Sequence, residues 1–191
     1  MSVSELVLNA RIRARLTQSA LSERSGVAQS ALSQIENGER VPNWTTVERL
    51  LQSTGTSLVA IPTRRSDASA VSLQIRAALA HGDTPAAVRH FIQLNDDLAA
   101  EHGAIRVALT VSEPAPTGSK RWDAALSALA AYRLADEHLP EPFWVTDPSR
   151  QLRKAWTFGS GRYDVSVPRE NVPAAFLDRG VLIDRETLES V

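Results

Sequence analysis

Residues 29–34, in the first third of the chain, include four uncharged side chains that can form hydrogen bonds. If this polar run is helical, its apolar side chains share one face and its polar side chains share the other. The polar face consists of Gln29, Ser30, Ser33 and Gln34. An amide can bond adenine through two hydrogen bonds and a hydroxyl can donate or accept. A merely solvated face more often carries Glu and Lys, so the run is compatible with contacts to base edges of DNA, and an ordinary polar surface stays open as the alternative.

Patterns typical of catalysis or metal binding are weak in the rest of the chain. The histidines form no pair at the helical spacing of a metal site; they are His81, His90, His102 and His138. The carboxylate pairs Asp96-Asp97 and Asp136-Glu137 are adjacent in the sequence. Neighbours on a helix point about 100° apart, so neither pair forms an acid–base couple. We expect no enzyme activity, no cofactor and no metal ion.

The composition is that of a soluble globular protein with one or two domains. The chain has 191 residues, of which 43% are hydrophobic and 23% are charged. It has no cysteine, which excludes disulfides, thiolate nucleophiles and cysteine-bound zinc. No apolar stretch approaches the roughly 18 residues of a membrane helix, and the N-terminus lacks the order of a signal peptide. We expect a cytoplasmic protein with no membrane contact.

Charge is distributed unevenly along the chain. Residues 1–65 have a net charge of +3 and residues 66–191 a net charge of -4, within a total of -1. The polar stretch 63–69 lies at this change and has no apolar period. We predict a domain over residues 1–62, a linker over 63–69 and a second domain over 70–191. A basic part joined to an acidic part favours separate tasks.

Capping residues and apolar spacing predict four short helices in the first domain. The first helix is indicated by the spacing of Leu6, Leu8, Ile12 and Leu16. Thr17 caps a second helix, which Gly26 ends in a left-handed turn. The polar run forms a third helix over residues 29–37, and Asn43 caps a fourth. We expect Trp44, at the start of the fourth helix, to be a core or hydrophobic-staple residue rather than a platform for stacking.

Two short helices joined by a tight turn that contains glycine are the signature of a helix-turn-helix. The sequence also resembles the phage-repressor (Xre/Cro) type of this motif over roughly residues 9–61. The matching positions are Thr17-Gln18, Leu21, Gly26-Val27, Gln29-Ser30, Leu32, Ile35-Glu36-Asn37-Gly38, Arg40 and Pro42. The resemblance implies a DNA-binding domain whose third helix, the recognition helix, enters the major groove.

The resemblance also implies roles for individual residues. Gln29, Ser30 and Gln34 match positions that contact bases, and Ser33 shares their face. The positions expected to contact phosphates or to brace the recognition helix are Thr17, Gln18, Asn37 and Arg40. Ala28 departs from the family, which commonly has a Ser or Thr cap there. We expect Glu36 to be structural, either bonding within the domain or pairing with an arginine such as Arg40. At most two of Arg11, Arg13 and Arg15 can face phosphate.

The segment 57–61 is short, contains β-branched residues and is stopped by Pro62, which predicts a lone strand. This ending resembles that of the DNA-binding antitoxins that accompany HipA-type toxin kinases, where the strand pairs with its copy in a second subunit. The resemblance implies a homodimer joined through Leu58, Val59 and Ile61. Two recognition helices about 34 Å apart would suit a near-palindromic operator. The alternative is that the strand packs within its own C-terminal domain.

The second domain is expected to be larger, mostly helical and of the α+β class, so that the whole chain is mainly α. Helices are predicted over residues 71–80, from Thr84-Pro85 onward, from Trp122 to Tyr132, over 148–156 and near Pro173, and strands over 163–167 and 181–183. Residues 104–111 suit either a helix or a strand. We expect Trp122, Trp144 and Trp156 to be core residues, with an exposed partner-binding cluster as the alternative.

Together these patterns predict a transcriptional repressor that binds double-stranded DNA as a homodimer. The preferred form is an antitoxin-like autoregulator whose C-terminal domain binds a toxin or another protein partner. One alternative is a regulator whose C-terminal domain senses a small ligand, which a deep apolar pocket would support. The other is an enzyme domain fused to a DNA-binding head, which a buried carboxylate or histidine in a cleft would support.

Overall fold

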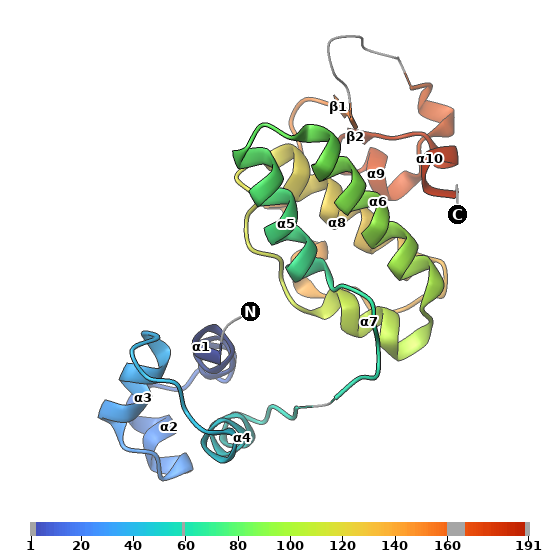
Figure 1. The fold of residues 1–191 in the computed structure, drawn as a ribbon. Helices are drawn as coiled ribbons and strands as arrows, with labels where there is room; N and C mark the ends of the chain where they lie inside the picture. Colours follow the sequence, from blue (N-terminus) through green and yellow to red (C-terminus); the bar gives the residue numbers. More distant parts are fainter. Residues whose placement is uncertain (1–2, 59, 160–166, 190–191) are drawn as a thin grey trace. The chain divides into compact units, whose positions relative to one another are not determined.

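The chain folds into two compact units, Met1–Ile61 and Pro62–Val191 (Figure 1). The computed structural model describes residues 3–58, 60–159 and 167–189. Over these ranges the chain is mainly helical, with ten α-helices and one sheet of two short strands. This agrees with the mainly α class expected from the sequence.

The first unit contains four helices at the places where capping residues predict them. They are α1 (Val3–Arg13), α2 (Gln18–Ser25), α3 (Gln29–Glu36) and α4 (Trp44–Ser53). Thr17 Oγ1 accepts a hydrogen bond of 3.1 Å from the backbone N–H of Ala20, and Asn43 Oδ1 accepts one of 2.9 Å from that of Thr46. Gly26 ends α2 with φ +66°, a left-handed conformation that glycine adopts without strain. The predicted caps are confirmed.

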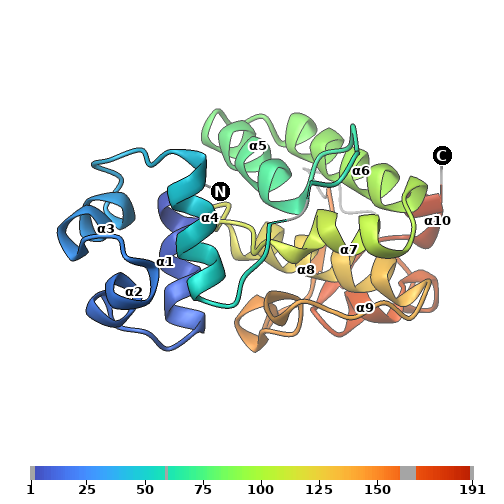
Figure 2. The same cartoon turned by 90° about the horizontal axis from the view of Figure 1, so that it is seen from below.

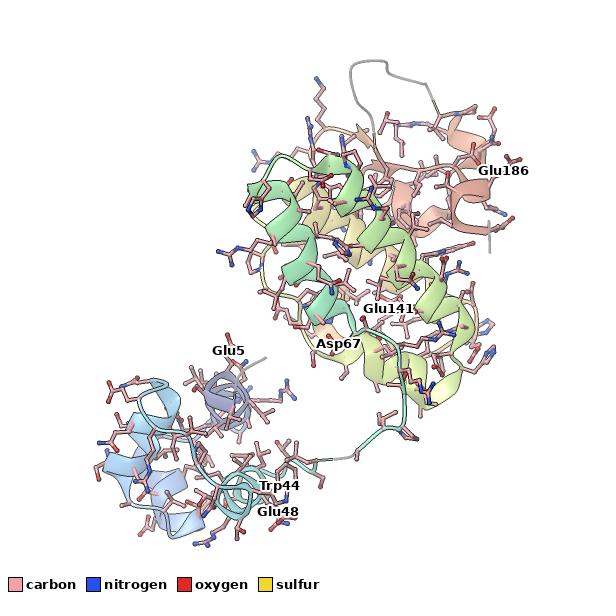
Figure 3. The ribbon with its side chains drawn as sticks, viewed as in Figure 1. Glu5, Trp44, Glu48, Asp67, Glu141 and Glu186 are labelled. Carbon is pink, nitrogen blue, oxygen red and sulfur yellow. The ribbon has the colours of Figure 1, made fainter. Side chains whose placement is uncertain are left out.

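Apolar side chains from all four helices form the core of the first unit. One cluster contains Val7, Leu21, Leu32, Ile35 and Leu50, and the adjoining one contains Ala10, Val47 and Leu51. The expectation of a core position for Trp44 is wrong, because this side chain is 65% exposed and projects from the first turn of α4 (Figure 3). The buried stripe of α4 begins one turn later, at Val47, so the first turn extends beyond both clusters.

The predicted strand at the end of the first unit forms no ladder among the residues that the structure describes. Residues 57, 58, 60 and 61 pair with no other described segment, and Val59 lies outside the described residues. Leu58 is 40% exposed. A strand needs a partner for its backbone N–H and C=O groups, so pairing with a second subunit stays a prediction.

The segment predicted as a linker is bound to the second unit rather than free. The division between the units falls after Ile61, and Asp67 caps α5 (Ala68–Ala80) through a 2.7 Å hydrogen bond from Ala70 N–H. Residues 68–69 are already the buried start of that helix. Residues 63–69 are therefore part of the second unit.

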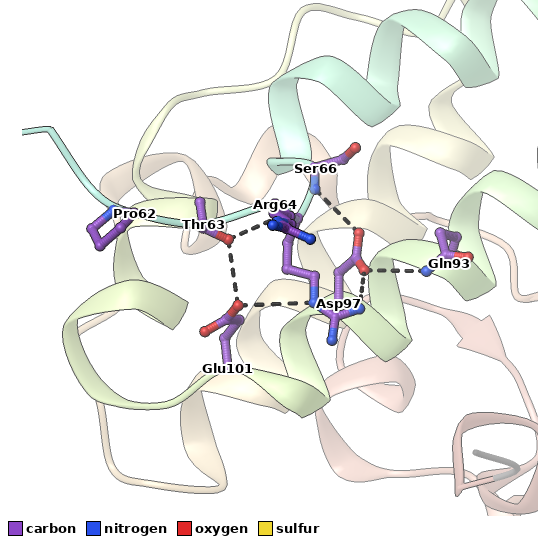
Figure 4. Close-up of a pocket in the computed structure, with 8 residues that line it drawn as sticks. Pro62, Thr63, Arg64, Ser66, Gln93, Asp97 and Glu101 are labelled. Atoms are coloured by element: carbon purple, nitrogen blue, oxygen red, sulfur yellow. Dashed lines mark hydrogen bonds and ion pairs between the residues drawn. The ribbon is translucent and has the colours of Figure 1, made fainter.

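A buried carboxylate holds this segment, residues 62–67, which we call the arm. Asp97 accepts hydrogen bonds of 3.2 Å from Arg65 Nη1 and from the backbone N–H of Ser66 (Figure 4). Gln93 donates to the same carboxylate at 3.1 Å. The two hydrogen bonds from the arm to Asp97 span 32 and 31 positions in sequence, which is why the polar composition of the arm predicted only a linker.

The second unit is built around one buried helix. Its long helices are α5, α6 (Thr84–Ala100), α7 (Gly103–Val111) and α8 (Lys120–Ala135). In α8 the side chains from Trp122 to Leu134 are almost all buried, because this helix packs on α6 and α7 and also on α9 (Ala174–Leu177) and β2 (Val181–Leu182) (Figure 2). Burial on several faces explains why α8 lacks a clear polar stripe.

Several predictions for the second unit are confirmed and others need correction. Residues 104–111 belong to a helix, and the helix predicted from Thr84 is capped by Asp83 instead. The helix predicted over 148–156 is only a 3₁₀ turn (Pro148–Arg150), because residues 156–157 form strand β1 (Trp156–Thr157), which pairs in parallel with β2. The strand predicted over 163–167 falls largely outside the described residues.

The remaining elements are short and lie near the C-terminus or beside α8. They are the 3₁₀ turns η1 (Phe143–Val145) and η3 (Arg169–Asn171) and the helix α10 (Arg185–Glu189). Trp122 and Trp144 are buried as predicted, whereas Trp156 is half-buried and packs against the same core. The core assignment therefore holds fully for two of these three tryptophans.

Candidate nucleic-acid interface

A tight turn at residues 26–28 sets the direction of α3 relative to α2. The N–H of Gly26 donates to Ser22 O at 2.9 Å and closes α2. Ser25 Oγ donates to Leu21 O at 2.7 Å and accepts from Val27 N–H at 3.3 Å. The two helices then pack through Leu21 and Leu32, both fully buried. This is the local geometry of a helix-turn-helix.

The two faces of α3 differ as the sequence predicts. Leu32 and Ile35 are buried in the core. On the opposite side Gln29, Ser30 and Gln34 are exposed and Ser33 is half-buried. Among the described residues, none of these four side chains has a hydrogen-bond partner, so their amide and hydroxyl groups are available to a ligand.

The N-terminus of α3 adds backbone donors to this face. Ala28 occupies the cap position with φ -54° and ψ 137°, but it offers no side-chain acceptor. The first N–H groups of a helix have no intrahelical partner, and the helix dipole makes this end partly positive. Both properties suit a phosphate group, and an uncapped end leaves the donors free for it.

A network of three side chains joins α1, α2 and α3 behind the recognition face. Glu36 Oε1 accepts from Arg11 Nε at 2.7 Å, and its Oε2 accepts from Arg11 Nη2 at 2.8 Å. Gln18 Nε2 donates to Oε2 at 2.8 Å. Arg11 Nη1 also donates to Leu16 O at 2.9 Å. The predicted structural role of Glu36 is confirmed, but its partner is Arg11 rather than Arg40.

The network shifts the protonation equilibria of both charged partners. Burial alone would raise the pKa of Glu36, but the hydrogen bonds from Arg11 and Gln18, with the charge of Arg11, outweigh it and leave this pKa below its ordinary value. The hydrogen bond to Glu36 raises the pKa of Arg11 despite its partial burial. Both groups are therefore charged at neutral pH, and Arg11 cannot also serve as a phosphate contact.

The residues expected to contact phosphate fall into two groups. Thr17 and Gln18 are used within the domain, Thr17 as the cap of α2 and Gln18 as a brace for Glu36. Asn37 and Arg40 are exposed just after α3, and Arg40 has no side-chain partner among the described residues. The sequence could not assign Arg11 to Glu36, since 25 positions separate them and only the packing of α1 on α3 brings them together.

The charge asymmetry between the halves is smaller than the sequence indicated. Arg64 and Arg65 belong to the second unit, so the first unit has six arginines against five glutamates. Its net charge is +1 instead of +3, and Arg11 with Glu36 forms a neutral pair inside it. The first unit is therefore not strongly basic, and any electrostatic attraction to DNA would depend on where its exposed arginines and helix N-termini lie.

Two surface recesses occur in the described parts of the second unit. A recess of about 590 Å³ lies between the arm and α6, where Asp97 and Glu101 are both engaged by Arg65 (Figure 4). Another of about 390 Å³ is lined in part by Tyr132, Asp136 and Arg185. No histidine lines either recess. In the described ranges, no three His, Asp or Glu side chains are arranged to hold a metal ion, and no helix is long and apolar enough to span a bilayer.

Comparison with known protein families agrees with this geometry for the first unit. Residues 8–62 match a family described as a helix-turn-helix domain. No curated protein and no solved structure matches the chain. The first unit is thus a helix-turn-helix domain, and such a domain indicates a DNA-binding regulator.

Proposed function

We propose that this chain is a sequence-specific transcriptional repressor of the Xre/Cro type. The observation that carries the proposal is the polar face of α3, whose four side chains point away from the core and make no hydrogen bond to the described residues. An uncommitted row of amides and hydroxyls on a recognition helix is suited to the base edges of the major groove.

In this proposal each group on α3 and around it has a separate task. Gln29 and Gln34 read bases, with Ser30 and Ser33 as the shorter contacts between them. The free N–H groups at the start of α3 and the guanidinium of Arg40 bind backbone phosphates and set the position of the helix in the groove. A repressor of this kind acts in the cytoplasm, where the DNA is.

The proposed repressor is a homodimer on a near-palindromic operator. Leu58, Val59 and Ile61 would form the pairing strand, and support comes from the exposure of Leu58 and from the unpaired state of the described part of segment 57–61. Pairing across a two-fold axis would satisfy both backbone edges. It would also place two copies of α3 about one turn of DNA apart.

The preferred form is an antitoxin-like autoregulator whose second unit binds a protein partner. The second unit supports this form because it has a hydrophobic core of its own. The helix-turn-helix of the first unit does not need a second folded unit of this size to bind DNA, so the second unit is available for another task. A small-ligand sensor is less favoured, since both recesses described above are open to solvent rather than deep. A toxin encoded beside this protein or purified with it would distinguish the antitoxin form from other regulators.

Operator binding by single variants tests the proposal. The operator is first selected from genomic fragments bound by the full chain. Gln29→Ala and Gln34→Ala should each weaken operator binding by about 1 to 3 kcal/mol and relax the preference at one base position. Gln52→Ala, an exposed glutamine on α4, is the matched control and should bind like the wild type. An equal loss on random DNA would contradict base reading by α3.

A further inference from the structure

One aromatic side chain of the second unit is exposed to solvent instead of packed in the core. Phe143 in η1 is 85% exposed, although the next two residues, Trp144 and Val145, are buried. The turn is closed by hydrogen bonds from Val145 N–H to Pro142 O at 3.0 Å and from Thr146 N–H to Phe143 O at 3.2 Å. The backbone at Phe143 is thus fixed while its ring is in solvent.

Hydrogen bonds made by the two buried residues of η1 hold the turn on the rest of the second unit. Trp144 Nε1 donates to Thr110 O at the end of α7 at 2.8 Å. Val145 O accepts from Ser127 Oγ on α8 at 2.9 Å and from Arg179 Nη2 at 2.7 Å. An aromatic group on such a rigid support loses little conformational entropy when it is buried by a partner.

A second exposed apolar residue lies at the same end of the unit. Val111 follows Thr110, the residue to which Trp144 is bonded, and it is 57% exposed. Burying a phenylalanine ring removes about 150 Å² or more from water, whereas a standard interface covers about 800 Å² on each partner. Phe143 and Val111 would therefore be the anchor of a larger interface rather than the whole of it.

The charges around this anchor are arranged with carboxylates outward and guanidinium groups inward. Glu113 is largely exposed and pairs at 3.2 Å with Arg150, whose guanidinium is buried and stacks over Trp144. Glu141 is exposed, and the charge facing it is the half-buried Arg179. From residue 134 to residue 149 the chain has no Lys or Arg. The charged carboxyl and amino side chains of this segment are therefore all carboxylates.

We propose that Phe143 and Val111, with Glu113 and Glu141 at their edge, form the docking surface for a protein partner that presents an apolar pocket rimmed by Lys or Arg. The inference rests on the proposed function, since it locates on the second unit the partner that the proposed autoregulator binds. Opposite charges at the rim steer association, and the buried aromatic ring supplies most of the affinity.

The test uses the full chain and the partner it carries. The chain is purified from its native host, the bound protein is identified and produced separately, and the dissociation constant is measured at several salt concentrations. Phe143→Ala should weaken binding at least tenfold. Glu141→Lys should slow association and reduce its salt dependence. Ile12→Ala and Glu170→Lys, at exposed positions outside the docking surface, are the matched controls and should leave binding unchanged.

Each outcome decides the inference, and operator binding is measured in parallel. If the identified partner binds Phe143→Ala as tightly as the wild type, the docking surface is wrong while the proposed function stands. If the wild-type chain binds its operator but carries no partner, the partner part of the proposed function fails and the inference fails with it. A dimer that Phe143→Ala converts to a monomer in light scattering would show that a second copy occupies the surface, which overturns the proposal. Because Phe143 is exposed, its variant should keep the wild-type melting temperature.

Discussion

Arg11 and Glu36 lie 25 positions apart in the sequence, and Nε of the arginine is 2.7 Å from Oε1 of the glutamate. The pair connects α1 to the last turn of α3, and Gln18 adds a bond from the start of α2 to the same carboxylate. Glu36 is thus the point at which three helices of the DNA-binding unit are fixed to one another. Its loss should affect the orientation of the recognition helix as well as stability.

Glu36→Gln should lower the stability of the first unit by about 3 kcal/mol, because Arg11 would keep a buried charge without its counter-ion. The pKa of Glu36 is lowered by folding, so the stabilisation is present above the ordinary value of 4.5 and is lost as the pH falls through the lower folded-state value. Thermal unfolding of the wild type from pH 7 to pH 3 should show this loss. A variant with the same acid dependence as the wild type would contradict the role of Glu36.

Ala28 leaves the start of α3 without a side-chain cap, so Ala28→Ser should raise the free energy of unfolding by about 0.5 to 1 kcal/mol. Thr17→Ala removes an existing cap and should cost about 1 kcal/mol. Chemical denaturation measures both changes. If Ala28→Ser has no effect on stability, its hydroxyl does not reach the N–H groups of α3.

Asp97→Ala should release the arm, since the backbone of Ser66 and the side chain of Arg65 both bond to this carboxylate. The expected result is cleavage by trypsin after Arg64 and Arg65 that is several times faster than in the wild type. Asp96→Ala, one position away on α6, is the control and should cleave at the wild-type rate. Unchanged cleavage of Asp97→Ala with an intact circular dichroism spectrum would mean that other contacts hold the arm.

Val59→Pro should give monomers, because proline removes a backbone N–H from the proposed pairing strand. Sedimentation equilibrium measures the change. Val59→Thr keeps a β-branched residue with its N–H and should preserve the dimer. A stable dimer of Val59→Pro would remove the strand from the interface.

The local features of the helix-turn-helix were predictable because the interactions that create them are local. A cap such as Thr17 or Asn43 bonds a residue three positions away, and a left-handed turn at Gly26 depends on the absence of its own side chain. The polar face of α3 follows from helical periodicity alone. These features carry the main evidence for DNA binding.

Features that depend on distant contacts required the tertiary structure. The sequence offered Arg40 only as an example of a partner for Glu36, and it assigned residues 63–69 to a linker, because nothing in local spacing connects Glu36 to Arg11 or Arg65 to Asp97. The sequence shows that Trp44 is apolar, which favoured a place in the core. Its exposure depends on which other side chains pack against it, and the sequence does not show that. In the same way residues 156–157 join a strand only because Val181 and Leu182 provide its hydrogen-bonding partner. Helix boundaries are set by neighbours in the chain, but burial, charge pairing and strand formation are set by whatever the fold brings alongside.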